Sequence, residues 1–232
     1  MTRVRSSIEA LARLVRRPAK RTRGDATPRC SLAKGSGGEE REQLIRRILS
    51  SIHNNSVLLS GQPGSGKSSM MLSLKGRLSS GSDPVMDFYP VSIDLRGVPE
   101  ALLFATVADA VLGQLAFAPP NRVARFGIDY GRRDLANDLH DVIRELIGRG
   151  SRRARLVLLV DGIDELNHYD PRTTQRVRSL FMTGLAENLV MVASAVEIDR
   201  HWEQEGSPWY NFFEEIELQP PGNEKDRLPC PG

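Results

Sequence analysis

Two short motifs carry residues whose types and spacing could bind and cleave a polyphosphate. The first lies in residues 56–69, Ser-Val-Leu-Leu-Ser-Gly-Gln-Pro-Gly-Ser-Gly-Lys-Ser-Ser, and contains the pattern G-x-x-x-x-G-K-[ST]. Glycines without a Cβ let the backbone curl around a phosphate and direct successive N–H groups at it. The pattern predicts a phosphate-binding loop, and the alternative is a glycine-rich turn that matches by chance.

The loop assigns a role to each kind of residue in it. Lys67 can reach the β- and γ-phosphates, where it supports catalysis as well as binding, and the Ser68 hydroxyl can ligate Mg²⁺. The residues expected to hold the nucleotide are Gly61, Gln62, Pro63, Gly64, Ser65, Gly66, Lys67, Ser68 and Ser69.

The second motif, residues 155–166, reads Arg-Leu-Val-Leu-Leu-Val-Asp-Gly-Ile-Asp-Glu-Leu. Its unbroken apolar run is typical of a central parallel strand, and ligands bind where such strands end. Asp161 is therefore expected to hold Mg²⁺ through water, opposite Ser68. Asp164 or Glu165, within the next turn, can activate the water that attacks the γ-phosphate. The alternative is a buried strand followed by a solvated acidic turn.

Strands and helices that alternate along the chain must position these motifs. This alternation predicts an α/β domain, with a central parallel sheet between two layers of helices. Strands are expected at residues 57–59, 88–95, 155–160, 189–194 and 213–218. Helices are expected at 35–54, 70–78, 100–117, 135–146 and from 171 onwards.

Two features near the last strands have more than one interpretation. The strand at 189–194 ends in Ser194, which could sense the γ-phosphate or simply be the end of a strand. The aromatic residues between 202 and 213 have few basic residues among them. They are therefore expected to cover the core rather than to stack on bases.

Composition indicates one soluble domain, expected at residues 35–222, before an unstructured end at 223–232. Apolar residues make up 40% and charged residues 26% of the 232 residues. No apolar run approaches the roughly 18 residues of a membrane helix. Only Cys30 and Cys230 are present, which favours a reducing compartment and predicts a cytoplasmic protein.

The charge is unevenly distributed. Residues 1–34 contain ten Lys or Arg and two acidic residues, whereas the remainder contains 22 basic and 27 acidic residues. Residues 1–34, the basic arm, have three interpretations. They could be a disordered extension or an overextended gene start, they could contact nucleic acid or an anionic membrane, or they could be an organelle transit peptide. If the arm is functional, weak binding to nucleic acid without sequence preference is expected.

With both motifs in place, residues 38–222 resemble the nucleotide-binding core of AAA+-type ATPases. The stretch Asp-Gly-Ile-Asp-Glu-Leu is most similar to STAND signalling ATPases and to bacterial and archaeal ATPases that are similar to origin-recognition proteins. The resemblance implies ATP and Mg²⁺ as cofactors. It also implies a P-loop NTPase fold of the additional-strand type, with strand order 5-1-4-3-2 and the strand at 189–194 between those at 57–59 and 155–160.

The chain departs from this family at three places. Relatives open with a hydrophobic-Gly-Arg-x-x-Glu box that contacts adenine, but residues 37–42 read Gly-Gly-Glu-Glu-Arg-Glu. Their fourth strand ends near an arginine, whereas Ser-Ala-Val-Glu follows here, at 194–197. A helical lid should follow Leu218, yet only 14 residues remain. We therefore expect a truncated or minimal core, with slow hydrolysis and no ring assembly.

The sequence leaves three functions open. The first is an ATP-binding protein with Mg²⁺-dependent ATP hydrolysis. The second is a regulatory switch or interaction module, whose nucleotide state governs a protein partner that binds the ATPase body. A P-loop kinase is the third, disfavoured because no phosphoacceptor-binding arginine set or mobile lid follows.

Overall fold

The computed structural model describes residues 37–81, 83–117, 130–150, 153–182, 185, 187–199, 202, 204 and 207–219. The basic arm at 1–34, the connection at 118–129 and the end at 223–232 lie outside these residues. The proposed domain boundaries therefore remain predictions.

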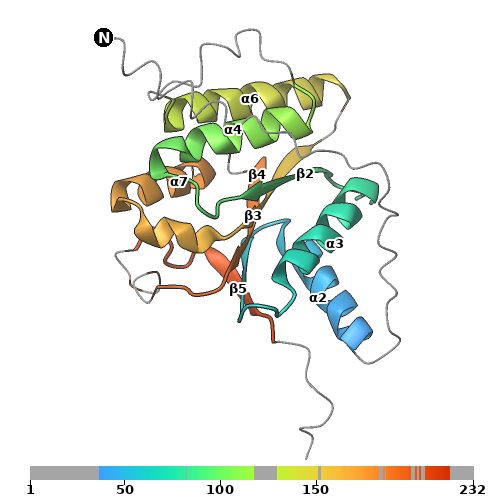
Figure 1. The fold of residues 1–232 in the computed structure, drawn as a ribbon. Coiled ribbons are helices and arrows are strands. Elements are labelled where there is room, and N and C mark those ends of the chain that lie inside the picture. The colour runs from blue at the N-terminus through green and yellow to red at the C-terminus, as the bar shows by residue number, and fades with distance from the viewer. Residues whose placement is uncertain are drawn as a thin grey trace, which may run out of the picture. The chain divides into compact units, whose positions relative to one another are not determined.

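The centre of the fold is a parallel five-stranded sheet (Figure 1). Its strands are β1 (Ser56–Ser60), β2 (Asp87–Asp94), β3 (Ala154–Asp161), β4 (Leu189–Ala195) and β5 (Phe213–Glu217). Their spatial order is β2-β3-β4-β1-β5, which confirms the predicted order 5-1-4-3-2. The strand that carries the phosphate loop and the strand that ends in Asp161 are therefore separated by β4 alone.

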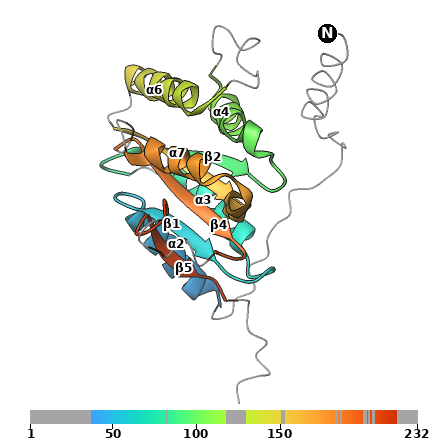
Figure 2. The same cartoon turned by 90° about the vertical axis from the view of Figure 1, so that its left-hand side faces the viewer.

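Helices cover both faces of the sheet, which confirms the three-layer prediction (Figures 1 and 2). One face packs against α2 (Gly37–Ser51) and α3 (Lys67–Ser80). The other face packs against α4 (Leu103–Gln114), α6 (Arg132–Gly148) and α7 (Pro171–Met182). Successive strand residues enter opposite layers, so that Val57 and Leu59 contact the first layer and Leu58 the second.

One of the expected helices differs in detail from the prediction, and another begins where it was predicted to begin. The segment at 100–117 is not one α-helix, because it opens with the 3₁₀ turn η1 (Glu100–Leu102) before α4 begins. Helix α7 begins at Pro171 as expected, and Asp170 Oδ1 accepts a hydrogen bond from the Arg172 N–H at 2.7 Å. Trp202 and Trp209 are buried and stacked on each other, which confirms that the late aromatic residues cover the core.

Arg155, at the base of β3, joins the sheet to the end of α2. Its guanidinium donates to the carbonyls of Ile52, at 2.8 Å, and of His53, and to that of Glu187 at 3.0 Å. Burial lowers the pKa of this guanidinium. A buried cation at the C-terminal end of α2 satisfies carbonyls that the helix itself leaves unpaired.

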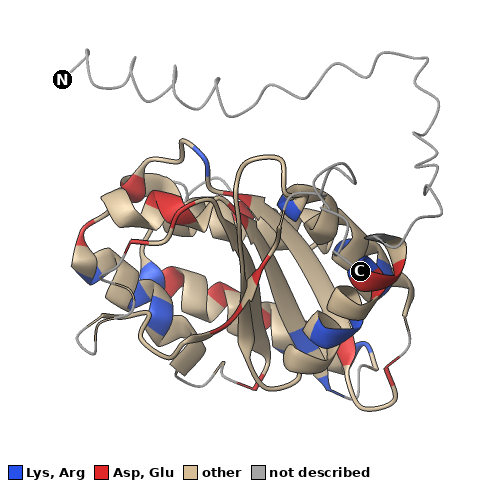
Figure 3. Cartoon of the chain, turned by 90° about the horizontal axis from the view of Figure 1, so that it is seen from below, with Lys and Arg blue, Asp and Glu red and all other residues tan. Residues whose placement is uncertain are grey.

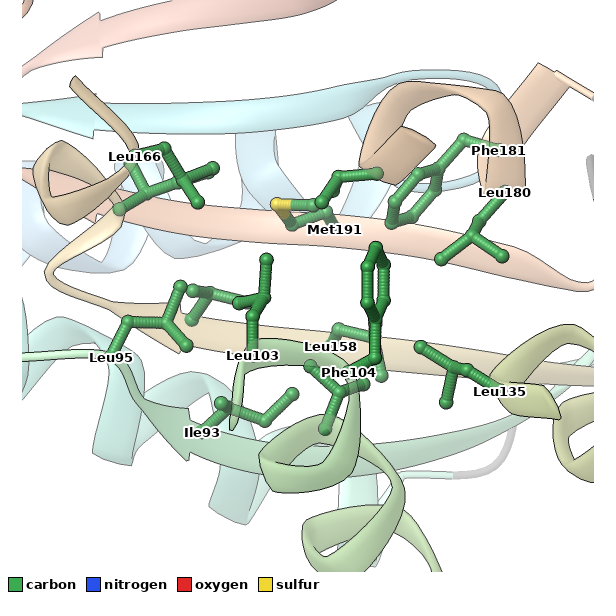
Figure 4. Close-up of a pocket in the computed structure, with 14 residues that line it drawn as sticks. Ile93, Leu95, Leu103, Phe104, Leu135, Leu158, Leu166, Leu180, Phe181 and Met191 are labelled. Atoms are coloured by element: carbon green, nitrogen blue, oxygen red, sulfur yellow. The ribbon is translucent and has the colours of Figure 1, made fainter. Parts of the chain in front are cut away.

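A small cavity lies between the sheet and the layer of α4, α6 and α7 (Figure 4). Its volume is about 30 Å³, and side chains such as Phe104, Phe181 and Met191 line it without any polar group. A cavity of this size and polarity is a packing gap and does not fit a nucleotide. Among the described residues, no helix is long and apolar enough to cross a membrane.

Candidate functional site

The phosphate loop connects β1 to α3 and has the conformation that its glycines predict. Gly64 and Gly66 adopt φ angles of +84° and +90°, a region that residues with a side chain rarely occupy. At Gly61 a Cβ atom would lie 2.3 Å from the carbonyl oxygen of Leu218, so only glycine fits beside the end of β5. The loop therefore approaches its neighbours by backbone alone, as a phosphate cradle requires.

Lys67 is the first residue of α3, and its side chain folds into the loop. The residue is only 8% exposed. Its Nζ donates to the carbonyls of Gly61 at 2.6 Å and Gln62 at 3.0 Å, and lies 3.4 Å from the Ser65 hydroxyl. The oxygens of the loop thus hold the ammonium within the loop, where it can turn to phosphate oxygens.

The two residues expected to hold Mg²⁺ meet although they lie 93 positions apart. The Ser68 hydroxyl donates to Asp161 Oδ2 at 3.0 Å. The other oxygen of Asp161, Oδ1, accepts from the hydroxyl of Ser194, a residue that is only 1% exposed. A serine hydroxyl and a carboxylate are hard oxygen donors, the ligand type of Mg²⁺ sites completed by substrate phosphates and water. Both residues therefore fit the ion, and Ser194 orients Asp161.

The two further acids lie in the 3₁₀ turn η2 (Ile163–His168), directly after β3. Glu165 Oε1 accepts the backbone N–H of Gly97 at 2.8 Å, so this carboxylate contacts the turn after β2. By contrast, Asp164 Oδ1 is buried without a hydrogen-bond partner. The acids are thus distinguished by their surroundings, because one is engaged by the protein and the other has an unpaired oxygen.

Comparison with known proteins identifies the family. The family model for the AAA ATPase domain matches residues 38–192, which is more than half of the chain. The chain belongs to this family. No curated protein matches it significantly.

Solved structures share the fold of this AAA ATPase domain. The Aeropyrum pernix ORC1 protein in complex with DNA has a TM-score of 0.54 at 16% identity, covering 82% of this chain and 46% of its own. Drosophila ORC bound to DNA has a TM-score of 0.54 at 13% identity, covering 78% and 42%. Cdc6p from Pyrobaculum aerophilum has a TM-score of 0.51 at 15% identity, covering 83% and 48%. The chain thus spans less than half the length of each of these structures.

The structure adds Arg96, which was not among the residues predicted from the sequence, to the site of this AAA ATPase domain. Arg96 Nη2 lies 3.4 Å from Asp161 Oδ2, the oxygen that also accepts from Ser68. Asp94 holds the same guanidinium with two hydrogen bonds, of 2.8 and 2.7 Å. Asp94 and then Asp161 raise the pKa of Arg96. The position of Arg96 just after a parallel strand was the signal available in the sequence.

Arg41 of α2 is the second residue that the sequence analysis did not place. Its Nη2 donates to the Ser69 hydroxyl at 3.0 Å and lies 3.5 Å from that of Ser73. The guanidinium therefore lies beside the N-terminal turn of α3, where the positive end of the helix disfavours a cation and favours an anion. Arg41 belongs to the Gly-Gly-Glu-Glu-Arg-Glu stretch at 37–42, which departs from the usual adenine-contacting box.

Proposed function

We propose that this AAA ATPase domain binds Mg·ATP between the phosphate loop and Asp161 and hydrolyses it slowly. The contact between Ser68 and Asp161 carries the proposal, because it joins the two motifs into one oxygen-lined site. The two residues come from motifs that are 93 positions apart in the sequence, and their side-chain oxygens are 3.0 Å apart.

Each part of the site has a distinct task in this proposal. The N–H groups of residues 61–69 cradle the phosphates, with the positive end of α3 behind them. Lys67 exchanges the loop carbonyls for β- and γ-phosphate oxygens. Ser68 and Asp161 would hold Mg²⁺, which neutralises charge on the β- and γ-phosphates when it is bound. Ser194 keeps Asp161 in the orientation that the ion needs.

Activation of the attacking water is assigned to Glu165 or Asp164. Glu165 must release the Gly97 N–H, or use its second oxygen, before it can accept a proton from water. Asp164 already has an oxygen without a partner. Glu165→Gln and Asp164→Asn keep the side-chain shapes, and the variant that loses turnover but keeps ATP affinity identifies the base.

Calorimetric titration with Mg·ATP tests the binding site. Lys67→Ala and Asp161→Asn should each lower the affinity at least tenfold, because a charged contact with the phosphates or their ion contributes roughly 1.5–3 kcal/mol. Lys75→Ala is the matched control, since this lysine of the same helix contacts Gln114 instead. Equal affinity of Lys67→Ala and the unaltered chain would refute the assignment.

A nucleotide-dependent switch is the second candidate function, favoured by the hydrogen bond that engages Glu165. In this case the nucleotide state is the output, read by a protein partner on the ATPase body. Steady-state turnover separates the two candidates. A rate within the 1 to 100 per second that is roughly typical of kinases would exclude the switch, and a rate far below it would support one.

We also propose that residues 1–34 contact nucleic acid weakly and without sequence preference. Their ten basic residues support this, as do two structural neighbours that were solved with DNA. The described residues carry both charge signs on the helices flanking the sheet (Figure 3). An electrophoretic shift assay at two salt concentrations should show salt-sensitive binding that disappears when residues 1–34 are deleted. Binding that survives the deletion would place the contact on the ATPase body.

A further inference from the structure

Arg96 contacts the carboxylate that is expected to hold Mg²⁺. Its guanidinium lies 3.4 Å from Asp161 Oδ2, and that oxygen lies 3.0 Å from the Ser68 hydroxyl. An ion on Ser68 and Asp161 would therefore bring a second positive charge to the carboxylate that Arg96 already contacts. Two cations at one carboxylate repel each other, so ion binding weakens the hold of Asp161 on Arg96.

Neighbouring residues contact the backbone and the side-chain stem around Arg96, whereas its guanidinium lies in the exposed part of the side chain. The Gly97 N–H donates to Glu165 at 2.8 Å, and the Val98 carbonyl accepts from the Tyr169 hydroxyl at 2.5 Å. The stem of Arg96 crosses Gly162, where an added Cβ would lie 2.5 Å from Arg96 Cγ. The side chain nevertheless remains 61% exposed, so its ion pairs cost little to break. A fixed stem with a releasable guanidinium suits an exchange of partners.

We propose that Arg96 exchanges Asp161 for the γ-phosphate when Mg·ATP binds, and so makes the site prefer ATP over ADP. This inference rests on the proposed function. The γ-phosphate supplies acceptor oxygens beside the ion, and a guanidinium can bind two of them at once. ADP brings an ion to the same carboxylate without those acceptors. Arg96 is thus a specificity-determining residue, and Asp94 positions it.

Calorimetric titration with two probes tests the exchange. The probes are Mg·ADP and the magnesium complex of the slowly hydrolysed analogue adenosine 5′-O-(3-thiotriphosphate). Arg96→Gln should lower the affinity for the analogue about tenfold or more, and that for ADP less than about threefold. Arg96→Lys, which keeps the charge but not the planar fork, should restore part of the preference. The readout is a ratio of affinities and does not depend on turnover.

Arg144→Gln is the matched control, because Arg144 is another exposed arginine paired with an aspartate, 3.2 Å from Asp141 on α6. It should change neither affinity. Equal changes in the two affinities of Arg96→Gln, in either direction, or no change at all, would overturn the inference and leave Arg96 as a clamp on Asp94. If the unaltered chain binds neither nucleotide, the proposed function fails as well, so the two failures can be told apart.

Discussion

Replacing Arg41 by alanine should affect nucleotide affinity and stability differently. In the structure, Arg41 contributes hydrogen bonds to Ser69 and Ser73, worth about 0.5–1.5 kcal/mol each at most. Its charge also opposes the positive end of α3, which costs about 0.3–1 kcal/mol. The cost offsets part of the hydrogen-bond contribution, and the contact with Ser73 is long for a hydrogen bond at 3.5 Å. The free energy of unfolding of Arg41→Ala should therefore stay within about 1 kcal/mol of the unaltered chain.

The affinity for Mg·ATP should nevertheless fall about ten- to a hundredfold, because a phosphate beside α3 would lose a charged hydrogen bond worth roughly 1.5–3 kcal/mol. Denaturant unfolding without nucleotide measures the first quantity, and calorimetric titration measures the second. Arg46→Ala is the control, since Arg46 is exposed on the same helix. A large loss of stability, or an unchanged affinity, would show that Arg41 supports the fold and not the nucleotide.

Two further predictions concern the helix that carries Arg41. Arg155→Ala should lower the free energy of unfolding by about 2–4 kcal/mol, because it leaves buried carbonyls unpaired. Arg153 is exposed, so Arg153→Ala should change the free energy of unfolding by less than about 0.5 kcal/mol. Denaturant unfolding of the two variants compares these effects. Hydrogen bonds from Ser51 and Arg47 lower the pKa of Glu214, so its stabilising effect is complete above the ordinary pKa and lost as the pH falls through the lowered value. Glu214→Gln should therefore be less stable than the unaltered chain at pH 7 and equally stable well below about pH 4, as unfolding curves across this range would show.

Patterns that repeat along the backbone made most of the fold predictable. The run at 156–160 is apolar throughout because β3 is buried on both faces, and this identified it as a central strand. Lys67 and the glycines of the phosphate loop have fixed spacing in the sequence, because the backbone of the loop itself surrounds the phosphate. The rule that parallel strands present ligands at their carboxyl ends then anticipated the meeting of Ser68 and Asp161. The strand order, which spacing alone does not determine, came from the family resemblance and is confirmed.

Long side chains that leave turns or helix ends could not be placed from the sequence. Arg41 reaches Ser69 across 28 positions, and Glu165 meets the N–H of Gly97 across 68. Such contacts depend on how neighbouring elements pack, and they produce no period in the sequence. The role of Ser194 could not be predicted for the same reason. Whether it senses the γ-phosphate or simply ends a strand depends on which residue faces it in the neighbouring strand. In the structure the residue opposite is Asp161.

In the described site, the cationic side chains contact oxygens of the protein. These contacts must break before the same side chains can bind the phosphates of a nucleotide. Lys67 contacts the carbonyls of its own loop, and Arg96 contacts Asp94 and Asp161. On the proposed function, ATP binding exchanges these partners for phosphate oxygens, so the observed affinity is the difference between two sets of charged contacts. Exchange at Lys67 occurs with ADP as well as ATP, whereas exchange at Arg96 needs the γ-phosphate. A site built this way can bind both nucleotides and still distinguish them, which is what either a slow ATPase or a switch requires.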